Sequence, residues 1–180
     1  MLQLILSKLN NKLSKDVLWT IGSFTVLAIS GIIINIVITK LKGSSYLGVF
    51  NISYAIYIVS SQIAVLGIHY SVLRHVAYYK ESKDKINEIF FSAVTIALIF
   101  GFFIFILLYN FYDLSKIFFD NDLSTKIVKY SSFGLIIFPL NKVLFAYLQG
   151  LRKMKIFSIL LSTKYVSLLI WILVICLYNF

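Results

Sequence analysis

Acidic residues, cysteine, histidine and proline are all scarce in this sequence. Seven Asp and Glu stand against 17 Lys and Arg, and the chain has one cysteine, two histidines and one proline. A lone cysteine, Cys176, excludes an intrachain disulfide and a cysteine metal cluster. His69 and His75 lack the second histidine or carboxylate that a metal site needs. No nucleophile elbow, phosphate loop or paired acid motif is present. The sequence therefore predicts no enzyme, no catalytic residue, no metal and no cofactor.

Long apolar runs are what the chain has instead. Hydrophobic residues make up 60% of the 180, and the mean hydropathy is +0.92, more than a soluble domain of this length can bury. About 20 helical residues cross a ~30 Å hydrocarbon core, and the runs are continuous instead of alternating, which favours helices over barrel strands. The sequence predicts an all-α integral membrane protein with about five transmembrane helices. The predicted spans are residues 17–39, 46–72, 89–112, 127–148 and 156–177, within a bundle that covers 17–180.

Residues 1–16 have a different pattern. Apolar residues recur at helical spacing beside a stripe of lysines, which predicts an amphipathic helix in the membrane surface. A secretory signal is the competing interpretation. It is disfavoured because the following run of about 23 residues is longer than a signal core and no small-residue cleavage site follows it.

The basic residues between the spans predict the orientation of the chain. Lys and Arg of short loops are retained on the cytoplasmic side. With a cytoplasmic N-terminus, ten of them lie on inner segments and five on outer ones. We therefore expect a multi-pass protein of the cytoplasmic (inner) cell membrane with its N-terminus inside. Anionic lipid headgroups account for the net charge of +10, so membrane lipids are expected partners and nucleic acid is not.

Two lysines lie inside predicted spans. Lys164 is near the middle of the fifth run, and Lys142 is six residues before the end of the fourth. A lysine at a helix centre costs about 2.5–3.5 kcal/mol on insertion scales, so it is expected to face a bundle interior or a wet cavity. Snorkelling of the long side chain to the interface is the alternative. Because the two runs travel in opposite directions, both ammonium groups are expected at a similar depth.

Small and polar residues recur on one face of the second span. They are Ser53, Tyr57, Ser60, Ala64, Gly67 and Ser71. Such a seam indicates either close helix packing or a polar cavity wall, to which Ser61 and Gln62 would add. The same two interpretations apply to Gly31 and Asn35 in the first span. Pro139 is expected to kink the fourth span.

Three stretches together resemble the N-terminal region of polysaccharide biosynthesis flippases of the O-antigen type. They are "LSKDVLWTIGSFTVLAISGIIINIVITKLKGSSYLGVFNISYAI", "LGIHYSVLRHVAYYKES" and "FAYLQGLRKMKIFSI". These transporters belong to the multidrug, oligosaccharidyl-lipid and polysaccharide exporter superfamily, and the resemblance runs from about residue 13 to residue 177. It implies most of one six-helix bundle of a fold in which two bundles face a central cavity.

The resemblance also implies a function and a site. Such flippases pass an undecaprenyl-diphosphate-linked oligosaccharide across the cytoplasmic membrane, and their cavities are typically basic. On this basis Lys164 and Lys142 are the candidate substrate-cavity cations, with Gln62 and Asn35 as weaker polar contacts. Five spans are fewer than the family's twelve to fourteen, so the chain is expected to be an incomplete N-terminal fragment, with missing C-terminal helices or a second subunit as partner.

Other functions are compatible with the same sequence. A related exporter could carry another amphiphile, although an exporter of drug cations generally needs buried acids, which the predicted spans lack. A non-transporting membrane scaffold or remnant is a further alternative. A membrane-embedded transferase is a weaker one, because no catalytic groups are recognised.

Overall fold

A computed structural model describes residues 2–114 and 122–178, and side chains from residue 12 onward except those of 114–124 and the last two residues. Every regular element in this part of the chain is helical. The chain divides into two compact units, residues 1–44 with 152–180 and residues 45–151. Each unit has its own packing.

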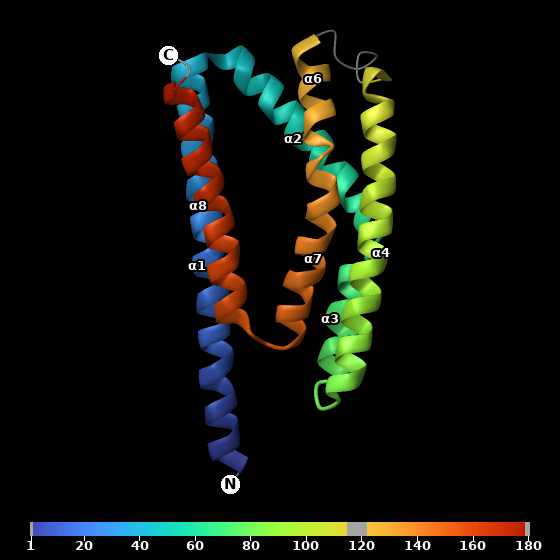
Figure 1. Cartoon of the computed structure of the whole chain (residues 1–180). Helices are drawn as coiled ribbons and strands as arrows, with labels where there is room; N and C mark the ends of the chain where they lie inside the picture. The colour runs from blue at the N-terminus through green and yellow to red at the C-terminus, as the bar shows by residue number, and fades with distance from the viewer. Residues whose placement is uncertain (1, 115–121, 179–180) are drawn as a thin grey trace. The chain divides into compact units, whose positions relative to one another are not determined.

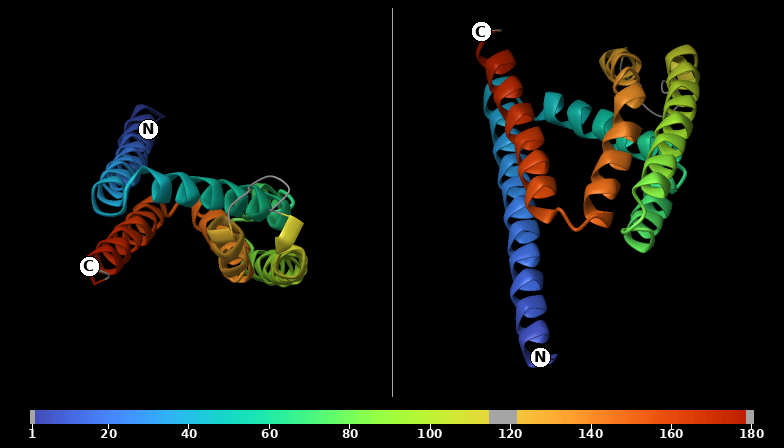
Figure 2. Two further views of the ribbon diagram at one scale, coloured as in Figure 1. Left: turned by 90° about the horizontal axis from the view of Figure 1, so that it is seen from above. Right: turned by 60° about the horizontal axis from the view of Figure 1, so that its bottom comes forward.

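The first unit pairs the N-terminal and C-terminal helices. Helix α1 (Leu2–Lys42) and helix α8 (Met154–Tyr178) lie side by side and run in the same direction (Figures 1 and 2). Ser23 and Ser30 of α1 are buried, as is Ser158 of α8. Small residues at such positions let membrane helices approach closely, which explains why two otherwise exposed apolar helices associate along their length.

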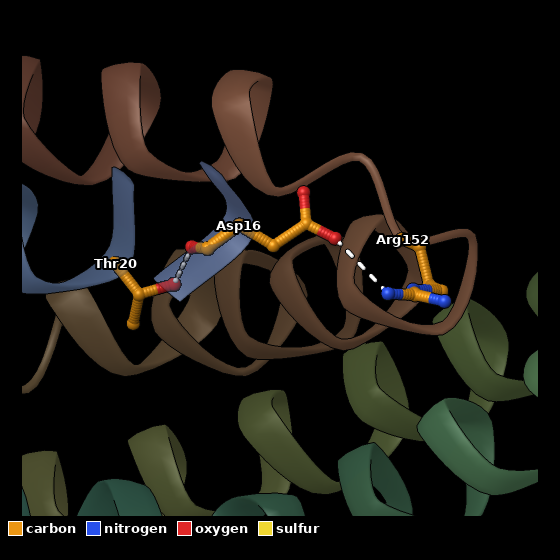
Figure 3. A network of polar contacts seen from close by, with 3 residues as sticks. All are labelled: Asp16, Thr20 and Arg152. Carbon is orange, nitrogen blue, oxygen red and sulfur yellow. Dashed lines mark hydrogen bonds and ion pairs between the residues drawn. The ribbon is translucent and has the colours of Figure 1, made fainter. Parts of the chain in front are cut away.

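An ion pair joins the start of α8 to α1 (Figure 3). Arg152 Nη2 lies 3.3 Å from Asp16 Oδ2, and Thr20 Oγ1 donates to the Asp16 carbonyl oxygen at 2.9 Å. Arg152 has a φ of 55°, which is uncommon for a residue with a side chain. The pair therefore fixes a strained turn at the point where the chain enters α8.

Helix α1 continues through the segment predicted to lie in the membrane surface. It begins at Leu2 and passes residue 16 without a break, for a length of about 60 Å. The amphipathic stripe rests mainly on side chains of residues 1–11, which lie outside those that the structure describes. An interfacial role for residues 1–16 stays a prediction.

The second unit packs three helices around an apolar core. Its elements are α2 (Ser44–Val65), α3 (Ile68–Tyr78), α4 (Lys83–Asn110), the 3-10 turn η1 (Tyr112–Leu114), α6 (Asp122–Ser131) and α7 (Gly134–Gly150). Helices α3, α4 and α7 are in mutual contact. Their core consists of Val72, Val76, Ile86, Ala93, Ala97, Val143 and Ala146.

Two glycines permit this close packing. A Cβ on Gly101 of α4 would lie 2.9 Å from the Leu135 carbonyl oxygen and 3.2 Å from Pro139 Cγ, both on α7. A Cβ on Gly150 of α7 would lie 2.9 Å from Val76 Cβ and 3.0 Å from the Leu73 carbonyl oxygen, both on α3. Helix α7 therefore touches one neighbour near each of its ends through a glycine.

The helices confirm the predicted membrane class. Four described helices, α1 from Lys12, α2, α4 and α8, are long and apolar enough to cross a membrane. Residues Thr125–Ser131 and Gly134–Gly150 make a fifth candidate that is bent by 50°. The bend lies at residues 132–133. A kink at Pro139 itself stays a prediction. Pro139 sits in the second turn of a continuous α7, where its missing N–H removes the helical hydrogen bond that residue 139 would otherwise donate to the Leu135 carbonyl oxygen.

Candidate polar site at a broken span

The second predicted span, residues 46–72, is divided in the structure. Helix α2 ends at Val65 and α3 begins at Ile68, and between them Leu66 has φ 47° and Gly67 has φ 75°. Glycine adopts positive φ without steric cost, which is why the chain can turn here. The Leu66 N–H donates to the carbonyl oxygens of Gln62 (3.2 Å) and Ile63 (3.1 Å). A break at membrane depth is tolerated only where protein or a water-filled cavity surrounds it.

Two of the four predicted site residues meet beside this break. Lys142 Nζ of α7 donates to Gln62 Oε1 of α2 at 2.5 Å, although the residues are 80 positions apart in the sequence. The same ammonium lies 5.4 Å from the centre of the Phe138 ring. Lys142 is half-buried and Gln62 is exposed. The Lys142 side chain therefore reaches a neighbouring helix of its own unit.

His69 lies on the other side of the break, in the first turn of α3. The His69 ring lies 4.0 Å from that of the adjacent Tyr70. Its Nδ1 is buried and has no hydrogen-bond partner among the described residues. His69 was not among the predicted site residues. The available signal was a histidine two residues after a glycine inside an apolar run.

The other two predicted residues lie in the first unit. Lys164 is half-buried on α8, and its Nζ is 5.6 Å from the centre of the Tyr165 ring. Asn35 of α1 is exposed, and its Nδ2 donates to the Gly31 carbonyl oxygen at 2.8 Å within its own helix. The side-chain amide of Asn35 is thus partly used by α1 itself. A common depth for Lys164 and Lys142 stays a prediction.

The small-residue seam of the second span packs closely in its first half. The Tyr57 ring meets Phe138 edge-on with centroids 5.4 Å apart, and its hydroxyl donates to the Gly134 carbonyl oxygen at 3.4 Å. A Cβ on Gly134 would lie 2.9 Å from the Tyr57 ring. Ser53 is also buried. These contacts favour the packing interpretation for this part of the seam.

Comparison with known proteins identifies the family. A family model described as "Polysaccharide biosynthesis protein" matches residues 13–179, nearly the whole chain. No curated protein and no solved structure matches the chain significantly. Members of this family are generally transporters and not enzymes. The all-helical, multi-pass architecture agrees with that character. The chain belongs to the polysaccharide biosynthesis protein family.

Proposed function

We propose that this protein acts as a flippase, moving undecaprenyl-diphosphate-linked oligosaccharide repeat units across the cytoplasmic membrane for surface polysaccharide biosynthesis. Its N-terminus faces the cytoplasm in this proposal. Family membership supports a role in polysaccharide biosynthesis, and the apolar helices support a location in a membrane. The observation that carries the transport site is the contact between Lys142 and Gln62 beside the broken span.

The chemistry of this contact suits a diphosphate headgroup. A lysine ammonium binds phosphate as a point charge, and a carboxamide adds N–H donors. Because Gln62 Oε1 accepts from Lys142, the amide nitrogen of Gln62 remains the end that donates to a ligand. Transporters place substrate sites at discontinuous helices, where backbone groups are also accessible. Leu66 and Gly67 form such a discontinuity one turn after Gln62, to whose carbonyl oxygen the Leu66 N–H donates.

Substitution of Lys142 tests this site in the gene's natural host. We expect Lys142→Gln to reduce surface polysaccharide about tenfold or more, because it removes a charge-assisted contact to the diphosphate. Lys142→Arg keeps the charge and retains part of the export. Gln62→Leu causes a smaller loss, and the double variant is no worse than Lys142→Gln alone, since the two side chains act together.

Lys129→Gln is the matched control. Lys129 is half-buried, like Lys142. Its Nζ, however, lies 4.9 Å from the ring centre of Tyr109 on α4 and 4.4 Å from that of Tyr112 on η1. Its loss leaves export unchanged if the effect is specific to Lys142. All variants are compared at equal membrane abundance. Normal export by Lys142→Gln would refute the assignment, and Lys164→Ala tests the second predicted cation in the same assay.

A further inference from the structure

A surface groove of about 510 Å³ runs between α3 and α4, away from Lys142 and Gln62. Its floor is apolar and closed by the buried residues Val72 and Ala93. All of its lining belongs to residues 45–151, so it is complete within the second unit. The volume lies within the range of about 300–1,000 Å³ that is typical of ligand sites.

The groove has the length of one membrane leaflet. Its α3 wall extends from Ile68 to Tyr79 and its α4 wall from Lys85 to Ile96. Each wall spans 11 helical steps, or about 17 Å, against about 15 Å for half of the hydrocarbon core. The two helices are antiparallel, so Ile68 and Ile96 lie at one end and Tyr79 and Lys85 at the other (Figure 1). The groove is therefore apolar at the end beside the α2–α3 break and polar at the end beside the α3–α4 turn.

The polar end holds one cation and one anion side by side. Lys85 and Glu88 are both exposed and both line the groove, one turn apart on α4, with Cβ atoms about 5–6 Å apart. Lys85 Nζ lies over the Tyr79 ring, 4.6 Å from its centre. His75 completes this end of the groove, and its Nδ1–H donates to the Ser71 carbonyl oxygen at 2.8 Å. The mouth thus presents a positive and a negative group to one ligand.

We propose that this groove binds a bilayer glycerophospholipid with a phosphoethanolamine headgroup. The lipid phosphate pairs with Lys85, its ammonium donates to Glu88, and one acyl chain lies along Ile68, Ile89 and Ile96. A purely anionic headgroup would meet the Glu88 carboxylate without compensation. A choline headgroup has no N–H donor for that carboxylate. The charge pattern of the mouth therefore selects the primary ammonium.

Lipid retention measured by native mass spectrometry tests the proposal. The purified full chain in detergent is titrated separately with dioleoyl phosphatidylethanolamine, phosphatidylcholine and phosphatidylglycerol. We expect the ethanolamine lipid to be retained most tightly. Glu88→Gln lowers the apparent affinity for the ethanolamine lipid about fivefold and abolishes its preference over the choline lipid. Lys85→Gln instead lowers the affinities for the ethanolamine and choline lipids alike, by about fivefold. Ser92→Trp on the groove rim weakens all lipids, because the indole occupies the acyl path.

Lys80→Gln and Glu81→Gln are the matched controls, because they make the same charge changes in the α3–α4 turn without lining the groove. Both retain the wild-type preference if the proposal is right, and circular dichroism confirms the helix content of every variant. Equal retention of the three lipids, or equal effects of control and groove variants, would overturn it. So would a change of oligomeric mass with Ser92→Trp and no change in lipid binding, since protein would then cover the groove.

Discussion

The α4–α7 interface leaves no space for a side chain at Gly101, and Gly101→Ala tests how tightly the second unit is packed. The new Cβ would lie 2.9 Å from the Leu135 carbonyl oxygen, a distance that real Cβ atoms essentially never show. The neighbouring atom belongs to the backbone of α7, so no side-chain rotation relieves the clash. Helix α7 must move away from α4, and the contacts of Pro139 with Gly101 loosen with it.

The cost follows from two opposing terms. Overpacking a well-packed interface costs about 1–3 kcal/mol. Alanine is the better helix former by about 1 kcal/mol, which offsets part of that cost. Gly31 of α1 offers a matched control, because it also lies inside a long helix and a Cβ there meets no atom within 4 Å. The difference between Gly101→Ala and Gly31→Ala therefore isolates the clash at about 1–3 kcal/mol.

Thermal unfolding of the two variants in the same detergent measures this difference. About 2–4 °C of Tm change accompanies each kcal/mol in a chain of this size, so Gly101→Ala is expected to melt about 2–12 °C below Gly31→Ala. The fluorescence of Trp19 and Trp171 reports only the first unit. The transition is therefore followed by far-ultraviolet circular dichroism. Equal melting temperatures for the two variants would show that α4 and α7 are not in the close contact described above.

Substitutions at three further residues test individual contacts. Asp16→Asn is expected to cost about 0.2–1 kcal/mol, since the pair with Arg152 is partly exposed, and a double-mutant cycle by thermal melting should return a coupling of that size. Arg152→Gly should melt at a higher temperature than Arg152→Ala, by an amount equivalent to about 1 kcal/mol. Both variants lose the ion pair, but only glycine adopts φ 55° without steric cost. The opposite order of melting temperatures would show that the backbone at residue 152 is not strained. Tyr57→Phe should cost about 0.5 kcal/mol of stability, the low end for a hydrogen bond, because the contact with the Gly134 carbonyl oxygen is long. Tyr57→Ala also removes the ring and should cost several times more in the same thermal melting measurement.

The membrane class was predictable because the hydropathy of the sequence indicates it directly. A continuous apolar run of 20 or more residues has few alternatives to a spanning helix. The interruptions inside the runs were harder to locate. Gly67 was counted as a member of a packing seam, and its positive φ is a property of the fold that composition does not reveal. Likewise the fourth run bends at residues 132–133, where no proline stands.

The site was predictable in its chemistry and only partly in its geometry. The free-energy cost of placing a charged side chain inside a membrane indicates that Lys142 needs a polar environment. Gln62 stands out as a polar residue within a predicted span. Their contact joins residues 80 positions apart, and no local pattern encodes it. The parallel pairing of α1 with α8 is similarly non-local. It depends on buried serines, and no local sequence pattern marks those serines as contact positions. His69 was missed because its position depends on the break that precedes it.

Helix α3 explains why the broken span and the groove occur in the same part of the molecule. It is an 11-residue helix of about 16 Å, too short to span a membrane, and it needs a protein neighbour at the break. Helix α7 supplies one, since it is in contact with α3. Gly150 of α7 packs against Val76 and the Leu73 carbonyl oxygen near the end of α3. The break at Leu66 and Gly67 therefore redirects the chain along α7, and the neighbouring face of α3, with Ile68, Ser71 and His75, forms the groove with α4.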